Sequence, residues 1–123
     1  MTQTKPKILV VDDDADLADA IQLFFDLEGW DSESASSGNE AIRLLEQKSF
    51  SLVLSDIRMP NGTGVDLIKW MKTSRPSVPI ILMTGFADIS APEASALGAV
   101  ALIKKPFEAE VVMSTIRKFI SWA

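Results

Sequence analysis

The chain has 123 residues, 47% of them hydrophobic and 24% charged, which is the balance of one ordinary globular domain. It contains no cysteine and no histidine, so disulfides, the usual zinc sites and imidazole acid–base chemistry cannot come from within it. Its net charge of −5 argues against direct nucleic-acid binding, and because it has neither a membrane-length apolar run nor a signal-peptide-like start, we expect a cytoplasmic protein without membrane contacts.

The first third of the chain alternates between strand and helix patterns. Residues 7–11 form a continuous apolar run, typical of a strand covered on both faces, and the run stops at three consecutive aspartates. Asp14 then precedes apolar residues at helical spacing, so we expect it to cap a first helix that ends at Gly29. Residues 30–35 are polar and predict a weak strand at the edge of a sheet.

The centre of the chain repeats this alternation. Ser37 and the three residues after it form a cap signal for a short second helix. Residues 52–54 predict a short buried strand, which is followed by Asp56 and then by the turn-forming residues 59–62. Asp56 is therefore expected at the carboxyl end of a strand, ahead of a third helix over residues 65–74.

In the last third of the chain the fourth helix has the weakest pattern. Asp88 is its predicted cap, and Pro92 is tolerable there only because it falls near the first turn. The predicted elements of this region are a strand over 78–84, a helix over 88–97, a strand over 100–103 and a final helix from 108 to about 121.

Five strand–helix units in succession predict an α/β fold. Because crossovers between parallel strands are right-handed, the strands should form one parallel sheet with helices packed on both of its faces. No linker or low-complexity segment interrupts the pattern, so we expect residues 1–123 to form a single domain.

Polar side chains gather at one end of this predicted sheet. Ligands bind outside the carboxyl ends of the strands in open α/β sheets. Carboxylates there suit magnesium, which prefers oxygen ligands. If Asp56 attacks a phosphoryl group, Lys105 can supply a positive contact and Thr84 a hydrogen bond. The full set at these strand ends is Asp12, Asp13, Asp56, Thr84 and Lys105.

The same positions resemble the receiver domain of two-component response regulators over essentially the whole chain. This resemblance implies a flavodoxin-like three-layer sandwich whose five-stranded parallel sheet has the order 2-1-3-4-5. It rests on four motifs that occur in the family's order and at similar separations: Val10-Val11-Asp12-Asp13, Asp56-Ile57-Arg58-Met59-Pro60 with Gly64, Met83-Thr84-Gly85, and Lys105-Pro106-Phe107.

The resemblance also implies a role for each site residue. Asp56 would accept a phosphoryl group from a histidine kinase or phosphotransfer protein. Mg²⁺ would be held by Asp13, Asp56 and the backbone carbonyl of Arg58, with Asp12 assisting. Thr84 would be the switch hydroxyl, and Lys105 the lysine that commonly precedes a cis proline.

The implied outcome of phosphorylation is a population shift on the face made by the fourth helix, the fifth strand and the fifth helix. A downstream protein or output domain would read this shift. The implied chemistry is limited to self-phosphotransfer and autodephosphorylation, so we expect a signalling module and not an enzyme.

The sequence departs from the family pattern at three places. Leu102 occupies the position of the usual switch aromatic, three residues before the lysine. The spacing between Thr84 and Lys105 is about one residue short, which together with Pro92 predicts a truncated or mobile fourth helix. Phe86, like Arg58, holds a position that tunes phosphoryl lifetime in the family, and we hypothesise that this bulky ring slows dephosphorylation.

Two other functions stay open at this point. One is a phosphohydrolase similar to the haloacid dehalogenases, with Asp12 as nucleophile and Asp14 as acid–base. The other is a pseudo-receiver that binds a partner without being phosphorylated. A homodimer is also considered, because Val111, Met113 and Trp122 lie off the apolar stripe of the final helix and could contact a partner.

Overall fold

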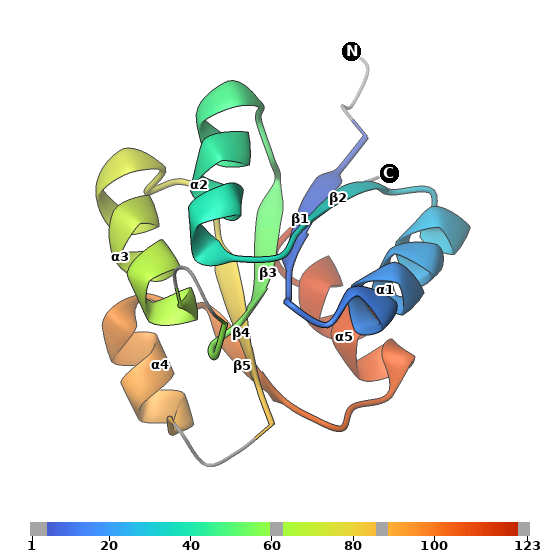
Figure 1. The fold of residues 1–123 in the computed structure, drawn as a ribbon. Coiled ribbons are helices and arrows are strands. Elements are labelled where there is room, and N and C mark those ends of the chain that lie inside the picture. Colours follow the sequence, from blue (N-terminus) through green and yellow to red (C-terminus); the bar gives the residue numbers. More distant parts are fainter. Residues whose placement is uncertain (1–4, 60–62, 86–88, 121–123) are drawn as a thin grey trace.

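The computed structural model describes residues 5–59, 63–85 and 89–120 (Figure 1). All five strands are parallel and form one sheet in the order β2-β1-β3-β4-β5, which confirms the predicted fold. The strands are β1 (Lys7–Val11), β2 (Asp31–Ala35), β3 (Leu52–Asp56), β4 (Ile80–Thr84) and β5 (Ala101–Lys104). The helices are α1 (Ala15–Glu28), α2 (Gly38–Gln47), α3 (Gly64–Ser74), α4 (Ala91–Leu97) and α5 (Ala109–Arg117).

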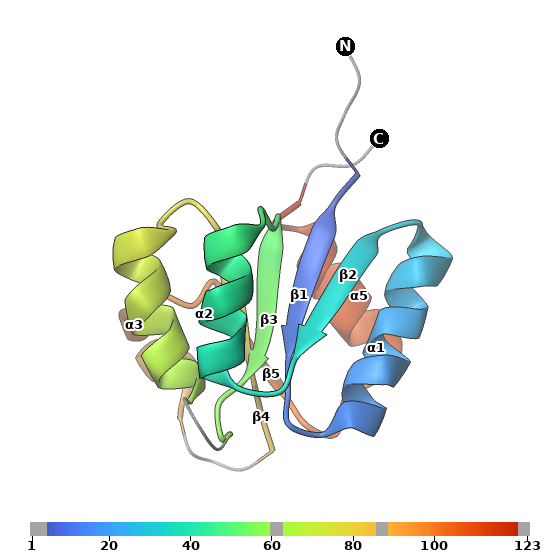
Figure 2. The same ribbon diagram turned by 45° about the horizontal axis from the view of Figure 1, so that its top comes forward.

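The helices cover the sheet as two separate layers. In Figures 1 and 2, α1 and α5 lie together on one side of the sheet, and α2, α3 and α4 lie on the other. Each layer encloses its own hydrophobic core against the strands. Among the described helices, none has both the length and the apolar character needed to cross a membrane.

The burial of β1 on both faces explains why apolar and polar residues do not alternate along it. Leu9 and Val11 face the core beneath α2 and α3, whereas Ile8 and Val10 face the core beneath α1 and α5. All four are fully buried, because a central parallel strand is covered on both faces.

The polar strand β2 lies at the sheet edge, as predicted. Glu33 on this strand pairs with Lys7 Nζ at 2.6 Å and with Lys48 Nζ at 2.8 Å. The hydrogen bonds from Lys48 and Lys7 lower the pKa of the Glu33 carboxyl. These ion pairs fasten the edge strand to β1 and to the end of α2.

Local capping chemistry sets the ends of α1 and α2. Asp14 Oδ1 accepts a hydrogen bond from the Leu17 amide at 3.2 Å, and Ser37 Oγ caps α2 in the same way. Gly29 ends α1 in the left-handed conformation with φ of 84°, which favours glycine. These three predictions from the sequence are confirmed.

The predicted start of α4 was wrong. The helix begins at Ala91, and its cap is Ser90, which exchanges side-chain and backbone hydrogen bonds with Glu93. Asp88 lies outside the described residues. Pro92 is the second residue of the helix, where its missing amide costs nothing, and the seven-residue length confirms that α4 is short.

The end of α5 was also predicted too late. The helix stops at Arg117, while Phe119 and Ile120 still pack against the core beneath α1 and α5. Because apolar burial continues past the last helical residue, the sequence pattern extends beyond the helix itself. The Phe119 amide donates to the Ile116 carbonyl in the closing turn.

Candidate functional site

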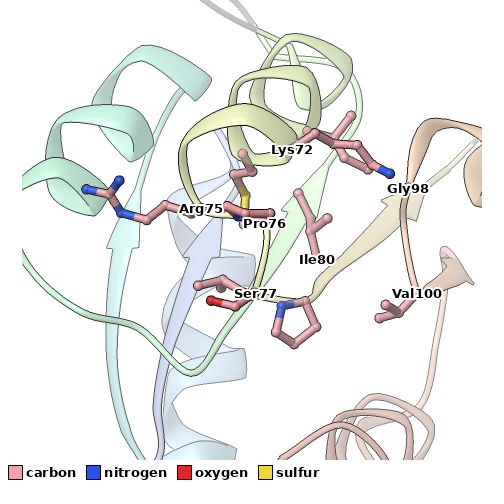
Figure 3. Close-up of a pocket in the computed structure, with 11 residues that line it drawn as sticks. Lys72, Arg75, Pro76, Ser77, Ile80, Gly98 and Val100 are labelled. Atoms are coloured by element: carbon pink, nitrogen blue, oxygen red, sulfur yellow. The ribbon is translucent and has the colours of Figure 1, made fainter.

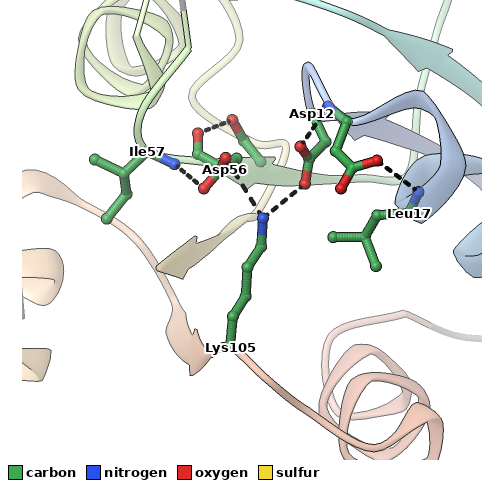
Figure 4. Close-up of polar contacts among 7 residues, drawn as sticks. Asp12, Leu17, Asp56, Ile57 and Lys105 are labelled. Carbon is green, nitrogen blue, oxygen red and sulfur yellow. Dashed lines mark hydrogen bonds and ion pairs between the residues drawn. The ribbon is translucent and has the colours of Figure 1, made fainter. Parts of the chain in front are cut away.

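The fold brings four predicted site residues to one end of the sheet. Asp12 directly follows β1, Asp56 is the last residue of β3, Thr84 is the last residue of β4, and Lys105 directly follows β5. Figure 4 shows Lys105 reaching between Asp12 and Asp56. The peptide bond between Lys105 and Pro106 is cis.

Three carboxylates form a compact cluster at this end. Asp12, Asp13 and Asp56 each offer a carboxylate oxygen, and these oxygens lie within 4.8 Å of one another. Asp12 is buried, Asp56 is half-buried and Asp13 is exposed, so the cluster opens to solvent on the Asp13 side. This donor set fits a hard cation such as Mg²⁺, which is held by one or two carboxylates together with water.

A single lysine contacts two of these acids. Lys105 Nζ lies 2.9 Å from Asp12 Oδ2 and 3.5 Å from Asp56 Oδ2. The Asp12 side chain is 1% exposed, and its other oxygen accepts a hydrogen bond from the Asp14 amide at 2.9 Å. The buried charge of Asp12 is therefore compensated on both of its oxygens.

Burial and neighbouring charges shift the pKa values of Asp56 and Lys105. Burial raises the pKa of the Asp56 carboxyl, and the negative charge of Asp12 adds to this rise, while Lys105 and the Ile57 amide oppose it. Burial alone would lower the pKa of Lys105, but its hydrogen bond to Asp12 and the two carboxylate charges outweigh burial and raise it. Lys105 therefore stays charged at neutral pH.

The Asp56 carboxylate is oriented by two different donors. Its Oδ1 accepts a hydrogen bond from the Ile57 amide at 2.9 Å, and its Oδ2 faces Lys105. The side chain of Asp56 is 13% exposed, so it remains reachable from solvent. An anchored and accessible carboxylate can act as a nucleophile.

The backbone of Asp56 has close neighbours of its own. A Cβ atom placed on Gly64, the first residue of α3, would clash with the Asp56 carbonyl oxygen and lie 3.0 Å from Ile57 Cα. Gly64 also donates its amide to the Ile57 carbonyl at 2.9 Å. The missing side chain thus lets α3 begin directly against the loop that follows β3.

Sequence reasoning missed one polar neighbour of Asp56. Ser55 is fully buried, and its hydroxyl donates to the Asp56 carbonyl at 2.8 Å. The available signal was a hydroxyl residue inside an otherwise apolar strand, which must find a partner when buried.

The remaining predicted positions lie around the cluster. Thr84 is buried, and its carbonyl accepts a hydrogen bond from the Lys105 amide at 2.6 Å. Arg58 is exposed and lines an open hollow of about 410 Å³ together with Asp13, Met59 and Thr63. Both Pro60 of the second motif and Phe86, the residue expected to slow dephosphorylation, lie outside the described residues.

Two other positions concern the predicted output and dimer faces. Leu102, in place of the switch aromatic, packs against the core beneath α2, α3 and α4. The prediction that Met113 contacts a partner was wrong, because this side chain is 4% exposed and belongs to the core beneath α1 and α5. Val111 is 47% exposed, and Trp122 lies outside the described residues.

Comparison with known proteins agrees with this geometry. The chain matches the family described as "Response regulator receiver domain" over residues 8–117. The chain belongs to this family, and it is a receiver domain of two-component response regulators. Its acidic cluster is compatible with metal binding.

Individual relatives extend this assignment. Over 121 residues the chain is 37% identical to the transcriptional regulatory protein FixJ of Bradyrhizobium diazoefficiens, a match covering 98% of this chain and 59% of FixJ. It is 34% identical to the transcriptional regulatory protein ZraR of Salmonella typhimurium, covering 98% of this chain and 28% of ZraR. The chain thus spans less than two thirds of either relative.

A solved structure supports the fold independently. A CheY-like response regulator receiver domain protein from Methanospirillum hungatei superimposes with a TM-score of 0.88 at 29% identity. The match covers 94% of this chain and 93% of that one. The likeness therefore extends over nearly the whole of both proteins.

Proposed function

We propose that residues 1–123 form one phosphoacceptor domain, in which Asp56 accepts a phosphoryl group from a histidine kinase or phosphotransfer protein of a His-Asp phosphorelay. The supporting observation is the contact of Lys105 with two carboxylates, at 2.9 Å from Asp12 and 3.5 Å from Asp56. A cation in this position lies where negative charge would gather on a phosphoryl group joined to Asp56. Since these 123 residues contain no histidine, the donor histidine lies outside them.

The proposed transfer is a displacement at phosphorus. An oxygen of the Asp56 carboxylate attacks the phosphorus of the donor phosphohistidine, the P–N bond breaks, and its electron pair stays on the imidazole nitrogen. The Ile57 amide and Lys105 hold the two Asp56 oxygens and restrict rotation of the carboxylate before attack. The phosphoryl group ends on the chain's own side chain, so the domain is a switch and not a turnover enzyme.

The metal would be held by the acidic cluster. Asp12, Asp13 and Asp56, with the backbone carbonyl of Arg58, are the proposed ligands of Mg²⁺. When bound, the ion supplies positive charge that offsets the charge of the carboxylates and of the phosphoryl oxygens. The exposed Asp13 leaves this side of the cluster open for the ion to enter.

The proposed response begins at Thr84 and ends at the α4-β5-α5 face. Thr84 ends β4, and its hydroxyl would donate to a phosphoryl oxygen on Asp56. Phosphorylation adds roughly −1.5 to −2 charges and strong acceptor oxygens, which favours the conformation that brings such a donor close. A downstream protein, or an output domain in a longer parent chain, would bind the shifted face.

The hydrolase alternative has less support. It requires Asp14 as acid–base, but Asp14 Oδ1 accepts the Leu17 amide at 3.2 Å as the cap of α1. The acceptor role and its competitors are separated by intact-mass spectrometry after incubation with Mg²⁺ and acetyl phosphate. One phosphoryl adduct that is lost in Asp56→Asn and without Mg²⁺ supports the proposal. An adduct kept in Asp56→Asn but lost in Asp12→Asn favours the hydrolase, and no adduct despite Mg²⁺ binding favours a pseudo-receiver.

A further inference from the structure

A cavity of about 240 Å³ lies at the other end of the sheet, between the ends of α3 and α4. Figure 3 shows this α3–α4 cavity, which is lined by residues of α3, of the loop that follows it, and by Ile80, Gly98 and Val100. Ile80 begins β4, whereas Thr84 ends it beside the acidic cluster, so four strand steps of about 3.3 Å separate the two places. The cavity is therefore distinct from the proposed phosphorylation site.

The walls of the α3–α4 cavity combine apolar side chains with polar groups. Ile68 and Met71 of α3 and Ile80 of β4 are buried core side chains that also line it. Pro76 and Pro79 line it from the loop and restrict the backbone there. The volume equals the share of about eight water molecules in the liquid, at roughly 30 Å³ each. This space suits the body of a small one-ring or short-chain organic molecule.

The charge of the lining is opposite to that of the protein. The net charge of the chain is −5, yet no aspartate or glutamate is among the described residues that line the cavity. Its charged residues are Lys72 and Arg75. The charged residues of the lining are thus both cationic, on a molecule that is acidic overall.

Of these two cations, Arg75 is already engaged. Its guanidinium donates to the Leu45 carbonyl at 3.0 Å and to the Ser74 carbonyl at 2.6 Å, and it stacks 5.5 Å from the centre of the Trp70 ring. In Figure 3 its side chain extends away from the cavity, toward α2. Arg75 therefore fastens α3 to α2 and is not available to a ligand.

Lys72 has no such partner. Among the residues that the structure describes, its ammonium makes neither an ion pair nor a hydrogen bond. Its side chain passes directly over Gly98, where any Cβ would clash with Lys72 Cε, and Figure 3 shows its nitrogen beside Gly98. Gly98 ends α4 with φ of 110°, so the glycine both closes the helix and leaves room for the lysine.

We propose that the α3–α4 cavity binds a small organic monocarboxylate, with its apolar body against Ile68, Met71 and Ile80 and its carboxylate on Lys72. Lys72 is exposed, so its ammonium is free to pair with an anion that enters from solvent, and the apolar side chains select against anions that lack a hydrophobic part. Ser77, which also lines the cavity, offers a hydroxyl as a second donor.

The test is an NMR titration of the amide-labelled chain with benzoate, with benzamide and acetate as matched probes. We expect benzoate to shift the amides of Ser77, Ile80, Gly98 and Val100. Benzamide and acetate should bind at least about tenfold more weakly, because benzamide lacks the carboxylate and acetate lacks the aromatic ring. Equal binding of benzamide would overturn the role of charge, and equal binding of acetate would overturn the role of the apolar walls.

Two variants and one control complete the design. Lys72→Gln should weaken benzoate at least about tenfold, and Val100→Phe should abolish binding by filling the cavity from its exposed rim. Lys69→Gln removes an exposed charge from the same helix outside the cavity and should leave binding unchanged. If Lys72 serves only the C-terminal dipole of α4, Lys72→Gln would lower stability without changing benzoate affinity. That result, or shifts centred on Lys105, would refute the site.

Discussion

Lys105 Nζ lies closer to Asp12 than to Asp56, at 2.9 Å from Oδ2 of the former and 3.5 Å from Oδ2 of the latter. Asp12 is almost fully buried, and among its contacts with described residues only the hydrogen bond from the Asp14 amide would remain without this lysine. Lys105 therefore neutralises the buried charge of Asp12, and in the proposed mechanism it also stabilises the phosphoryl group on Asp56. These two roles predict different effects of its removal.

Lys105→Gln should lower both stability and phosphorylation. Leaving the buried Asp12 without its counter-charge is expected to cost about 3 kcal/mol in the free energy of unfolding, measured with urea. Adduct formation from acetyl phosphate should fall strongly, because no cation faces the Asp56 oxygen. Lys104→Gln, the exposed neighbour, is the matched control and should change neither quantity. Unchanged adduct formation in a folded Lys105→Gln protein would remove the lysine from the mechanism.

The pH dependence of stability should carry the signature of Asp56. Burial raises its pKa in the folded protein above the reference value of 3.8, so the unfolded state loses this proton at lower pH than the folded state does. The free energy of unfolding that this carboxyl contributes is fully present below its pKa in the unfolded state. It is lost as the pH rises through its pKa in the folded state, where the buried carboxyl becomes charged. Asp56→Asn should therefore be more stable than the wild type at pH 7.

Urea unfolding of both proteins between pH 3 and pH 8 checks this expectation. The difference in the free energy of unfolding between Asp56→Asn and the wild type should shrink as the pH falls toward the reference pKa, because the wild-type carboxyl then also becomes neutral. Asp19→Asn, an exposed acid on α1, serves as a control for general charge effects. If the wild type is more stable than Asp56→Asn at neutral pH, burial does not destabilise the charged form of Asp56, and the expectation is contradicted.

The sequence predicted which side chains gather at one end of the sheet better than it predicted the helix ends, for physical reasons. An apolar run that stops at an acid places Asp56 at a strand end, and parallel strands carry their ends to the same edge of the sheet. The contact of Asp12 with Lys105 needed the fold, because 93 positions separate them. The pattern of residues around either position does not reveal that the two side chains touch.

The failures also have causes in particular residues. Asp88 and Ser90 are both acceptable caps, and only the Ser90–Glu93 capping box decides between them. Met113 lies off the stripe expected from spacing alone, yet the neighbouring α1 covers it. Tertiary packing widened the buried face of α5 beyond what its own sequence indicates.

Mg²⁺ should stabilise the chain through the acidic cluster. A ligand at ten times its dissociation constant adds about 1.4 kcal/mol to the free energy of unfolding, so the unfolding temperature should rise with Mg²⁺ concentration. Asp13→Asn is the informative variant, because Asp13 is exposed and its loss should weaken the response without damaging the core. Asp19→Asn, also exposed on α1, should respond like the wild type. An equal response in Asp13→Asn would place the ion elsewhere.

Gly64→Ala should be disruptive although the substitution adds a single methyl group. Its Cβ would clash with the Asp56 carbonyl oxygen, and both partners are backbone, so neither can move without shifting α3 or the end of β3. Overpacking of this kind costs about 1–3 kcal/mol, and displacement of the Asp56 backbone should also slow adduct formation. Gly85→Ala is the matched control, because the nearest atom to its new Cβ in the described part of the chain, outside its own neighbours, is Lys105 Cβ at 3.8 Å. Urea unfolding of the two variants should show a large loss for Gly64→Ala only, and equal losses would mean that the close approach of α3 to Asp56 is not required.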